Sequence, residues 1–120
     1  MKKIFLLIIL FFYCNPSFAD ITVKLWLDVK KKNLKDLIKL GEENIGGIGQ
    51  GIFWANISLK AIGKEPIYCQ PSKLALNRSN YVDLVNGQIA KQQKSGILKG
   101  DESLGMLLVF ALRETFPCKK

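Results

Sequence analysis

The chain has 120 residues, of which 18 are Lys or Arg and 10 are Asp or Glu, and it contains no histidine. A chain of this length supports one small domain with a single core. Without histidine, the Ser-His-Asp, Cys-His and histidine-ligated zinc arrangements are all excluded. Composition therefore indicates a small, basic domain with a formal net charge of +8.

The first nineteen residues have the order of regions found in a secretory signal peptide. Two lysines at positions 2 and 3 precede an apolar run over 4–13, and small residues follow at 17 and 19. The apolar run is shorter than the roughly 20 residues that a membrane-spanning helix needs. We predict a signal peptide over 1–19, cleaved after Ala19, and a single mature domain over 20–120 with a net charge of +6.

Two of the three cysteines remain after this cleavage, because Cys14 lies in the signal peptide. An even pair in an oxidising compartment predicts a structural disulfide between Cys69 and Cys118. The alternative is a reactive thiol pair, which would be expected to show a Cys-x-x-Cys spacing.

The first mature segment, 21–29, fits two secondary structures. Its apolar residues alternate as in a strand, but Thr22 could cap a short helix in which Val23, Trp26 and Leu27 share a face. No second convincing strand exists to pair with it, so we favour the helix.

The next segment, 34–62, has apolar residues at spacings of three and four over its whole length. This pattern predicts a long helix that Asn33 caps and that Gly63 ends, with Pro66 beyond. Five glycines lie inside it, and each costs roughly 1 kcal/mol relative to alanine. They are Gly41, Gly46, Gly47, Gly49 and Gly51. We expect a bend near 46–49, close packing of another helix on Gly47 and Gly51, or both.

The rest of the chain predicts two further helices and the loop between them. Asn77 caps a third helix, 94–101 is a loop, and Asp101 or Ser103 caps a last helix that is apolar on nearly every side. Phe116-Pro117 ends it. The fold class is therefore all-α, a compact bundle of about four helices with one disulfide.

Three stretches together resemble the Rap1a/Tai family of small exported proteins. They are the glycine-bearing helix over 44–56, the Cys-x-Pro turn within 66–76, and the Ala-Leu-x-x-x-Phe-Pro-Cys ending over 111–118. The chain departs from the pattern at Asn44, which stands where the family has a tyrosine, and it lacks the family's further cysteines. The resemblance is to a divergent member.

The resemblance implies an all-helical periplasmic domain with the Cys69–Cys118 link. It implies an immunity protein that binds and blocks a peptidoglycan-cleaving amidase effector of type VI secretion, and that can form a homo-oligomer. The alternative is a housekeeping or chaperone-like envelope protein of the same fold with no toxin partner.

Several side chains are candidates for partner binding. In the 94–101 loop, Ile97 and Leu98, with Lys99 beside them, either fold back on the core or protrude into a partner's cleft. Gly47 and Gly51 form either an intramolecular packing surface or a notch for a partner. Trp54 is expected in the core, with an exposed interface anchor as the alternative. We expect Asn56 to be buried and to bond the 69–71 turn.

A lysine cluster marks the junction of the first two helices. It comprises Lys30, Lys31, Lys32, Lys35 and Lys39. We interpret it as a solvated surface; the alternative is weak binding to an anionic surface such as phospholipid. No aromatic residues interleave with these lysines, so nucleic acid is not an expected partner.

The carboxylates do not form a paired acid–base site. Glu42 and Glu43, and likewise Asp101 and Glu102, are sequence neighbours, and adjacent helix residues point about 100° apart. We therefore predict no catalytic residues, no metal, no cofactor and no enzymatic activity.

Overall fold

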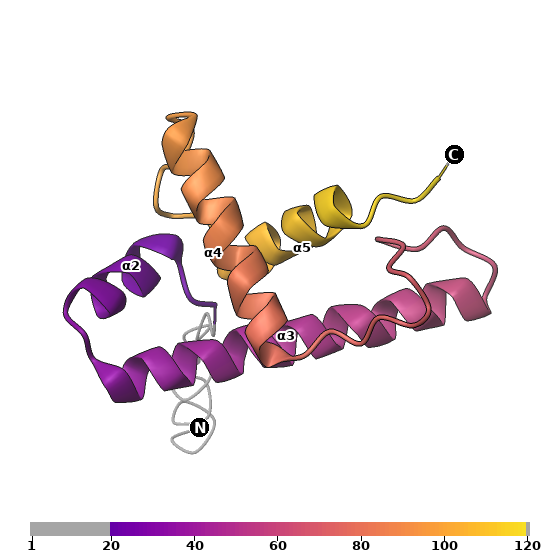
Figure 1. Cartoon of the computed structure of the whole chain (residues 1–120), viewed down its shortest axis with the longest axis horizontal. Helices are drawn as coiled ribbons and strands as arrows, with labels where there is room; N and C mark the ends of the chain where they lie inside the picture. Colours follow the sequence, from indigo (N-terminus) through magenta and orange to yellow (C-terminus); the bar gives the residue numbers. More distant parts are fainter. Residues whose placement is uncertain (1–19, 120) are drawn as a thin grey trace, which may run out of the picture.

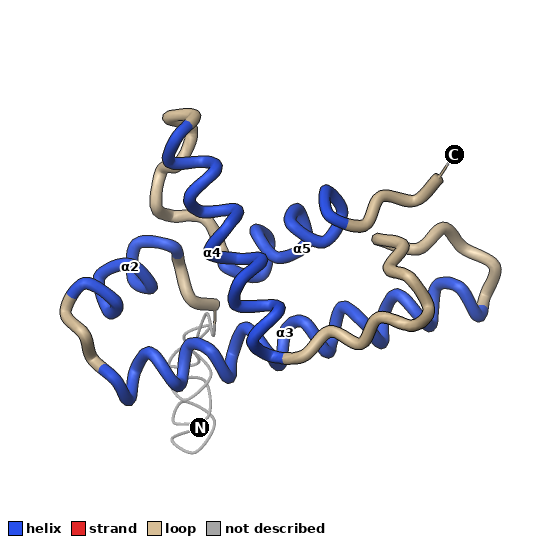
Figure 2. Tube along the Cα trace, viewed as in Figure 1, coloured by secondary structure: helices blue, strands red, loops and turns tan. Residues whose placement is uncertain are grey.

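A computed structural model describes residues 20–119, and the predicted signal peptide with Cys14 lies outside them. Four helices make up the described chain: α2 (Val23–Lys31), α3 (Lys35–Ala61), α4 (Arg78–Lys94) and α5 (Leu104–Thr115). Figure 2 shows that helices and loops account for residues 20–119, and a single bridge joins Thr22 to Ser103. The predicted all-α class is confirmed.

The long helix α3 is the element on which the others are arranged (Figure 1). Helix α2 folds back over its first half, and α4 rises from its middle. Helix α5 runs from α4 toward the C-terminal end of α3, and the segment 62–77 returns along the second half of α3. Their buried side chains form one core. Its members are Val23, Trp26, Ile45, Tyr68, Tyr81, Val82, Val85, Ile89, Leu104, Leu107, Leu108 and Leu112.

The first segment is a helix, as favoured, and Thr22 caps it. The Thr22 side chain accepts a hydrogen bond from the backbone N–H of Leu25 at 3.4 Å. Val23 and Trp26 are buried on one face. The indole of Trp26 reaches the core side of α3 and donates to Asn86 Oδ1 at 3.1 Å.

Helix α3 is continuous over 27 residues, so the glycines do not break it. The prediction that Asn33 caps it is wrong: the N-cap is Leu34, without a side-chain hydrogen bond. Asn33 has φ 51°, a left-handed conformation that asparagine tolerates well, because the chain reverses between α2 and α3 there. Gly63, with φ 68°, ends the helix as predicted.

Close packing occurs at three glycines of α3 other than the two predicted. A Cβ atom at Gly41 would collide with Trp26, at Gly46 with Arg78, and at Gly49 with Tyr81. Gly47 and Gly51 are exposed, and a Cβ at either would meet nothing within 4 Å. The intramolecular packing role of Gly47 and Gly51 is therefore wrong, because α2 and α4 approach a different side of α3.

Helix α4 begins as predicted. The Asn77 side chain accepts from the backbone N–H of Asn80 at 3.1 Å, and the Asn80 side chain accepts from the N–H of Asn77 at 2.9 Å. Ser103, not Asp101, caps α5. Helix α5 is buried on one face only, since Met106 and Phe110 are 46% and 41% exposed. The expectation of burial on nearly every side is corrected accordingly.

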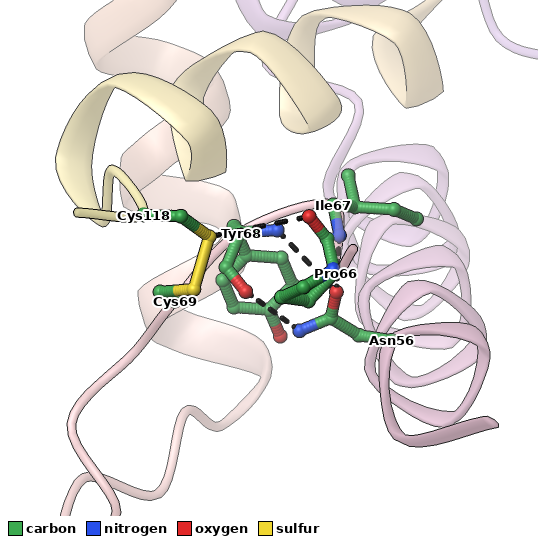
Figure 3. Close-up of a disulfide and its surroundings, with 6 residues drawn as sticks. All are labelled: Asn56, Pro66, Ile67, Tyr68, Cys69 and Cys118. Atoms are coloured by element: carbon green, nitrogen blue, oxygen red, sulfur yellow. Dashed lines mark hydrogen bonds between the residues drawn. A yellow bond between two sulfur atoms is a disulfide. The ribbon is translucent and has the colours of Figure 1, made fainter. Parts of the chain in front are cut away.

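The disulfide between Cys69 and Cys118 is present, with the two Cα atoms 4.9 Å apart. It joins the 62–77 segment to the chain that follows α5. Figure 3 shows how Asn56 of α3 fixes this segment from the other side. Its side chain accepts from the N–H groups of Ile67 and Tyr68, at 2.6 and 3.3 Å, and donates to the carbonyl of Tyr68 at 2.8 Å. The predicted structural role of Asn56 is confirmed, slightly earlier in the turn than expected.

Candidate functional site

The three loop residues predicted for partner binding lie between α4 and α5, and they differ in exposure. Ile97 is 62% exposed, and Lys99 is exposed beside it. Leu98 is partly buried and packs against the core. Of the two apolar residues, Ile97 is therefore the one that protrudes, whereas Leu98 anchors the loop.

Backbone hydrogen bonds hold this loop against the start of α2. The carboxylate of Glu102 accepts from the N–H groups of Lys99 and Gly100, at 2.7 and 2.6 Å. The hydrogen bond from Lys99 is the main reason why the pKa of Glu102 is lowered. The carbonyl groups of Gly100 and Glu102 accept from Lys24 and Val23, each at 2.9 Å. These hydrogen bonds fix the backbone of the loop that carries the exposed Ile97.

A hollow of about 430 Å³ lies beside Ile97, between the end of α4 and α5. Ile97 and Phe110 are the two large apolar side chains on its lining, with Arg113 and Glu114 near them. Phe110 was expected in the core. The sequence does carry a signal for its exposure: Met106 and Phe110 are four residues apart, and Arg113 continues their side of the helix.

A second hollow, of about 570 Å³, continues along the same two helices. Leu74, Leu84, Gly87 and Phe116 are among the residues that line it. Lys91 and Glu114 line both hollows and form an ion pair at 2.7 Å. Together the hollows make a surface of mixed apolar and charged side chains on α4 and α5.

Trp54 lies on the exposed side of α3 and is 62% exposed. The expectation that it belongs to the core is wrong. In this part of α3, Asn56 lies on the side of the helix that the 62–77 segment covers. Trp54 lies on the other side, which faces solvent. Its ring meets that of Phe53 edge to face, with centroids 5.4 Å apart. The structure does not bring Trp54 together with the α4–α5 loop.

The lysine cluster is exposed throughout: Lys30, Lys31, Lys32, Lys35 and Lys39. Lys30 has a structural contact, since its Nζ lies 5.3 Å from the centre of the Trp26 ring and donates to Asn86 Oδ1 at 3.2 Å.

Several carboxylates of the described residues have structural partners. Glu43 pairs with Arg78, and Glu102 and Glu114 make the contacts given above. Within residues 20–119, no group of three or more Cys, Asp or Glu side chains is placed to hold a metal ion. No helix of this part of the chain is long and apolar enough to cross a membrane.

Comparison with known proteins identifies no relative: no protein-family model, no curated protein and no solved structure matches the chain.

Proposed function

We propose that this chain is an immunity-type binding protein of the Rap1a/Tai kind. In this proposal it is exported to the periplasm, binds a peptidoglycan amidase effector of type VI secretion and occludes the effector's site. It performs no chemistry itself. The three stretches that resemble the family lie in α3, in the 62–77 segment and at the end of α5, and a disulfide suits an oxidising compartment.

The observation that carries the proposal is the exposed Ile97 on its braced loop, with Phe110 at the adjoining hollow. An inhibitor that blocks an enzyme by occupying its cleft needs a protruding apolar group. It also needs that group to be ordered before binding, because ordering a loop at an interface costs affinity. Four hydrogen bonds provide this order: two within the loop, accepted by the Glu102 carboxylate, and two from the backbone of α2 to the carbonyl groups of Gly100 and Glu102.

The test is whether a neighbouring gene encodes a cell-wall amidase, and whether the purified protein binds and inhibits that amidase. The variant Ile97→Asp places a charge at the proposed contact and leaves Leu98 in the core. We expect its affinity to fall roughly 30-fold or more, as for a central interface residue. Ile62→Asp is the matched control, because Ile62 is also exposed, at 70%, but lies at the end of α3.

Unchanged affinity of a folded Ile97→Asp protein would exclude the loop as the inhibitory element. If the unaltered protein neither binds nor inhibits the amidase, and cells without the gene resist it, the immunity function is wrong. That outcome would favour the housekeeping envelope protein.

A further inference from the structure

A small apolar pocket lies between α2 and the first half of α3, where α2 folds back along the longer helix (Figure 1). We call it the α2–α3 pocket. Its volume is about 200 Å³, and it shares no lining residue with the hollows on α4 and α5. Every residue on its lining is apolar or glycine, and most belong to the two helices: Leu25, Trp26, Val29, Leu37, Leu40 and Gly41.

The α2–α3 pocket has a buried floor and an exposed rim. Trp26 and Gly41 are buried and lie against each other, since a Cβ atom at Gly41 would collide with the Trp26 ring. Leu25, Leu37 and Leu40 are 53%, 48% and 63% exposed. The pocket therefore opens to solvent between three leucines, and an apolar molecule that enters it would cover leucine surface that is now in contact with water.

The lining determines what kind of group the α2–α3 pocket can hold. The indole N–H of Trp26 is the one polar side-chain group of this lining, and it already donates to Asn86 Oδ1 at 3.1 Å. A polar group inside the pocket would therefore lose its hydrogen bonds to water without replacement. The volume takes roughly six or seven groups the size of a water molecule, whereas a partner's helix is about 10–12 Å across. The group that fits is a short aliphatic chain.

Positive charge surrounds the opening of the α2–α3 pocket. From Lys24 to Lys39 the chain has six lysines and two aspartates, a net charge of +4, and all eight side chains are exposed. Lys32 lies three residues after Val29 and seven after Leu25, so it is on the pocket's side of α2. A charged group held at the rim would therefore lie within reach of lysine side chains.

The lysines near the opening outnumber the groups that could neutralise them. Asp28 and Asp36 are the two carboxylates of the same stretch. Lys30 is held within the structure, since it contacts Asn86 and the ring of Trp26. The ion pairs that the described residues form do not involve the other five lysines. The surroundings of the pocket therefore favour an anionic group over a cationic one.

We infer that the α2–α3 pocket binds the aliphatic chain of a single anionic amphiphile, such as a fatty acid or a lysophospholipid, with the charged end of the ligand among the lysines. The apolar lining selects the chain, and the excess positive charge selects the sign of the end group. This inference is independent of the proposed function, which uses the α4–α5 loop and the hollow beside it, so either can fail without the other.

The test is a titration of the mature, disulfide-bonded protein with n-alkyl sulfates from butyl to dodecyl, each below its critical micelle concentration. Nuclear magnetic resonance follows the indole N–H of Trp26, on the floor of the pocket, and that of the exposed Trp54 as an internal reference. We expect saturable shifts at Trp26 and none at Trp54. Each added methylene should raise the affinity roughly three- to fourfold until the pocket is full, at about seven carbons, and less beyond that.

Two variants of the rim test the location of the site. Leu37→Asp places a negative charge at the opening, and we expect it to weaken the binding of octyl sulfate roughly 10-fold or more. Ile57→Asp is the matched control, because Ile57 is on the same helix and 41% exposed but does not line the pocket. Leu40→Gln is a second, uncharged change at the rim and should weaken binding roughly 3-fold or more.

The sign of the end group is tested by a comparison of octyl sulfate with octyltrimethylammonium. We expect the sulfate to bind roughly 10-fold more tightly at low salt, and the double variant Lys32→Glu/Lys39→Glu to remove this preference. An affinity that rises equally with every methylene to dodecyl, or binding to anionic vesicles without binding of monomeric alkyl sulfates, would overturn the inference in favour of a membrane-surface contact. The absence of a saturable shift at Trp26, or binding that both rim variants leave unchanged, would also overturn it.

Discussion

At the scale of single residues, Asn56 determines where the mid-chain segment lies. It is 4% exposed, and its amide bonds three backbone groups: the two of Tyr68 are buried, and the N–H of Ile67 is partly buried. We expect Asn56→Ala to lower the free energy of unfolding by about 2–4 kcal/mol, because each buried unpaired group costs about 1–3 kcal/mol.

Urea unfolding of the disulfide-bonded protein measures this loss. Gln50→Ala serves as the control, since Gln50 is an exposed amide of the same helix. A loss no larger than that of the control would mean that the 62–77 segment is held without Asn56.

Tyr68 differs from Asn56, because its buried polar group is not hydrogen-bonded. The residue is 1% exposed, and its hydroxyl has no hydrogen-bond partner in the structure. Burial, with a smaller effect of Tyr81, raises the pKa of Tyr68 to about 12. We expect Tyr68→Phe to stabilise the protein at neutral pH by about 1 kcal/mol, since it removes a buried hydroxyl that gains nothing.

The same variant should change the alkaline behaviour. In the folded protein Tyr68 keeps its proton up to about pH 12, whereas in the unfolded chain it loses the proton near its ordinary pKa of 10. Unfolding therefore releases a proton between these values, and stability falls as the pH rises from 10 to 12, by roughly 2–3 kcal/mol from this group. Chemical unfolding at several pH values should show a shallower fall for Tyr68→Phe. An equally steep fall would assign the effect to other groups.

At the scale of the elements, the features of the helices that could be predicted from the sequence are ones that depend on nearby residues. The helix period of α3, the cap at Asn77 and the stop at Gly63 are local patterns, and all are confirmed. The choice among the five glycines depends on where Trp26 and Tyr81 approach α3. That approach is set by the packing of α2 and α4, so no pattern within α3 could show it.

Two of these glycines should respond oppositely to the same substitution. Gly49→Ala would force its Cβ into the Tyr81 ring, and such overpacking costs about 1–3 kcal/mol. Gly51→Ala adds a methyl group into open space and should stabilise the helix by about 0.5–1 kcal/mol. Thermal unfolding of the two variants, compared with the parent at one low concentration, gives both signs. Equal effects would mean that Tyr81 can move away from α3.

At the scale of the whole molecule, the candidate surfaces also depend partly on local residues and partly on how the helices pack. The sequence identified Ile97 as a residue that could protrude, and Trp54 as one that could be exposed. It did not identify Phe110, because α5 is apolar on most sides and the spacing of Phe110 to Met106 and Arg113 is a weak signal beside that apolar background. The Cys69–Cys118 pair was predictable because only two of the three cysteines lie outside the predicted signal peptide.

The disulfide should matter for stability far more than for the shape of the α4–α5 loop. It joins cysteines 49 residues apart, and the chain-entropy model gives roughly 4 kcal/mol for a loop of that size. We expect the double variant Cys69→Ser/Cys118→Ser, or reduction of the mature protein, to lower the melting temperature by roughly 15–25 °C. The N–H of Cys69 donates to the carbonyl of Phe116 at 2.8 Å beside the bridge, and this amide proton should exchange faster with solvent once the bridge is broken.

The loop around Ile97 is held in place by Glu102 and by α2, which the bridge does not touch. Reduced protein that is still folded should therefore bind the proposed amidase partner with unchanged affinity, as titration below the lowered melting temperature would show. A loss of binding in the folded, reduced protein would mean that the tail after α5, and not the loop, forms the contact.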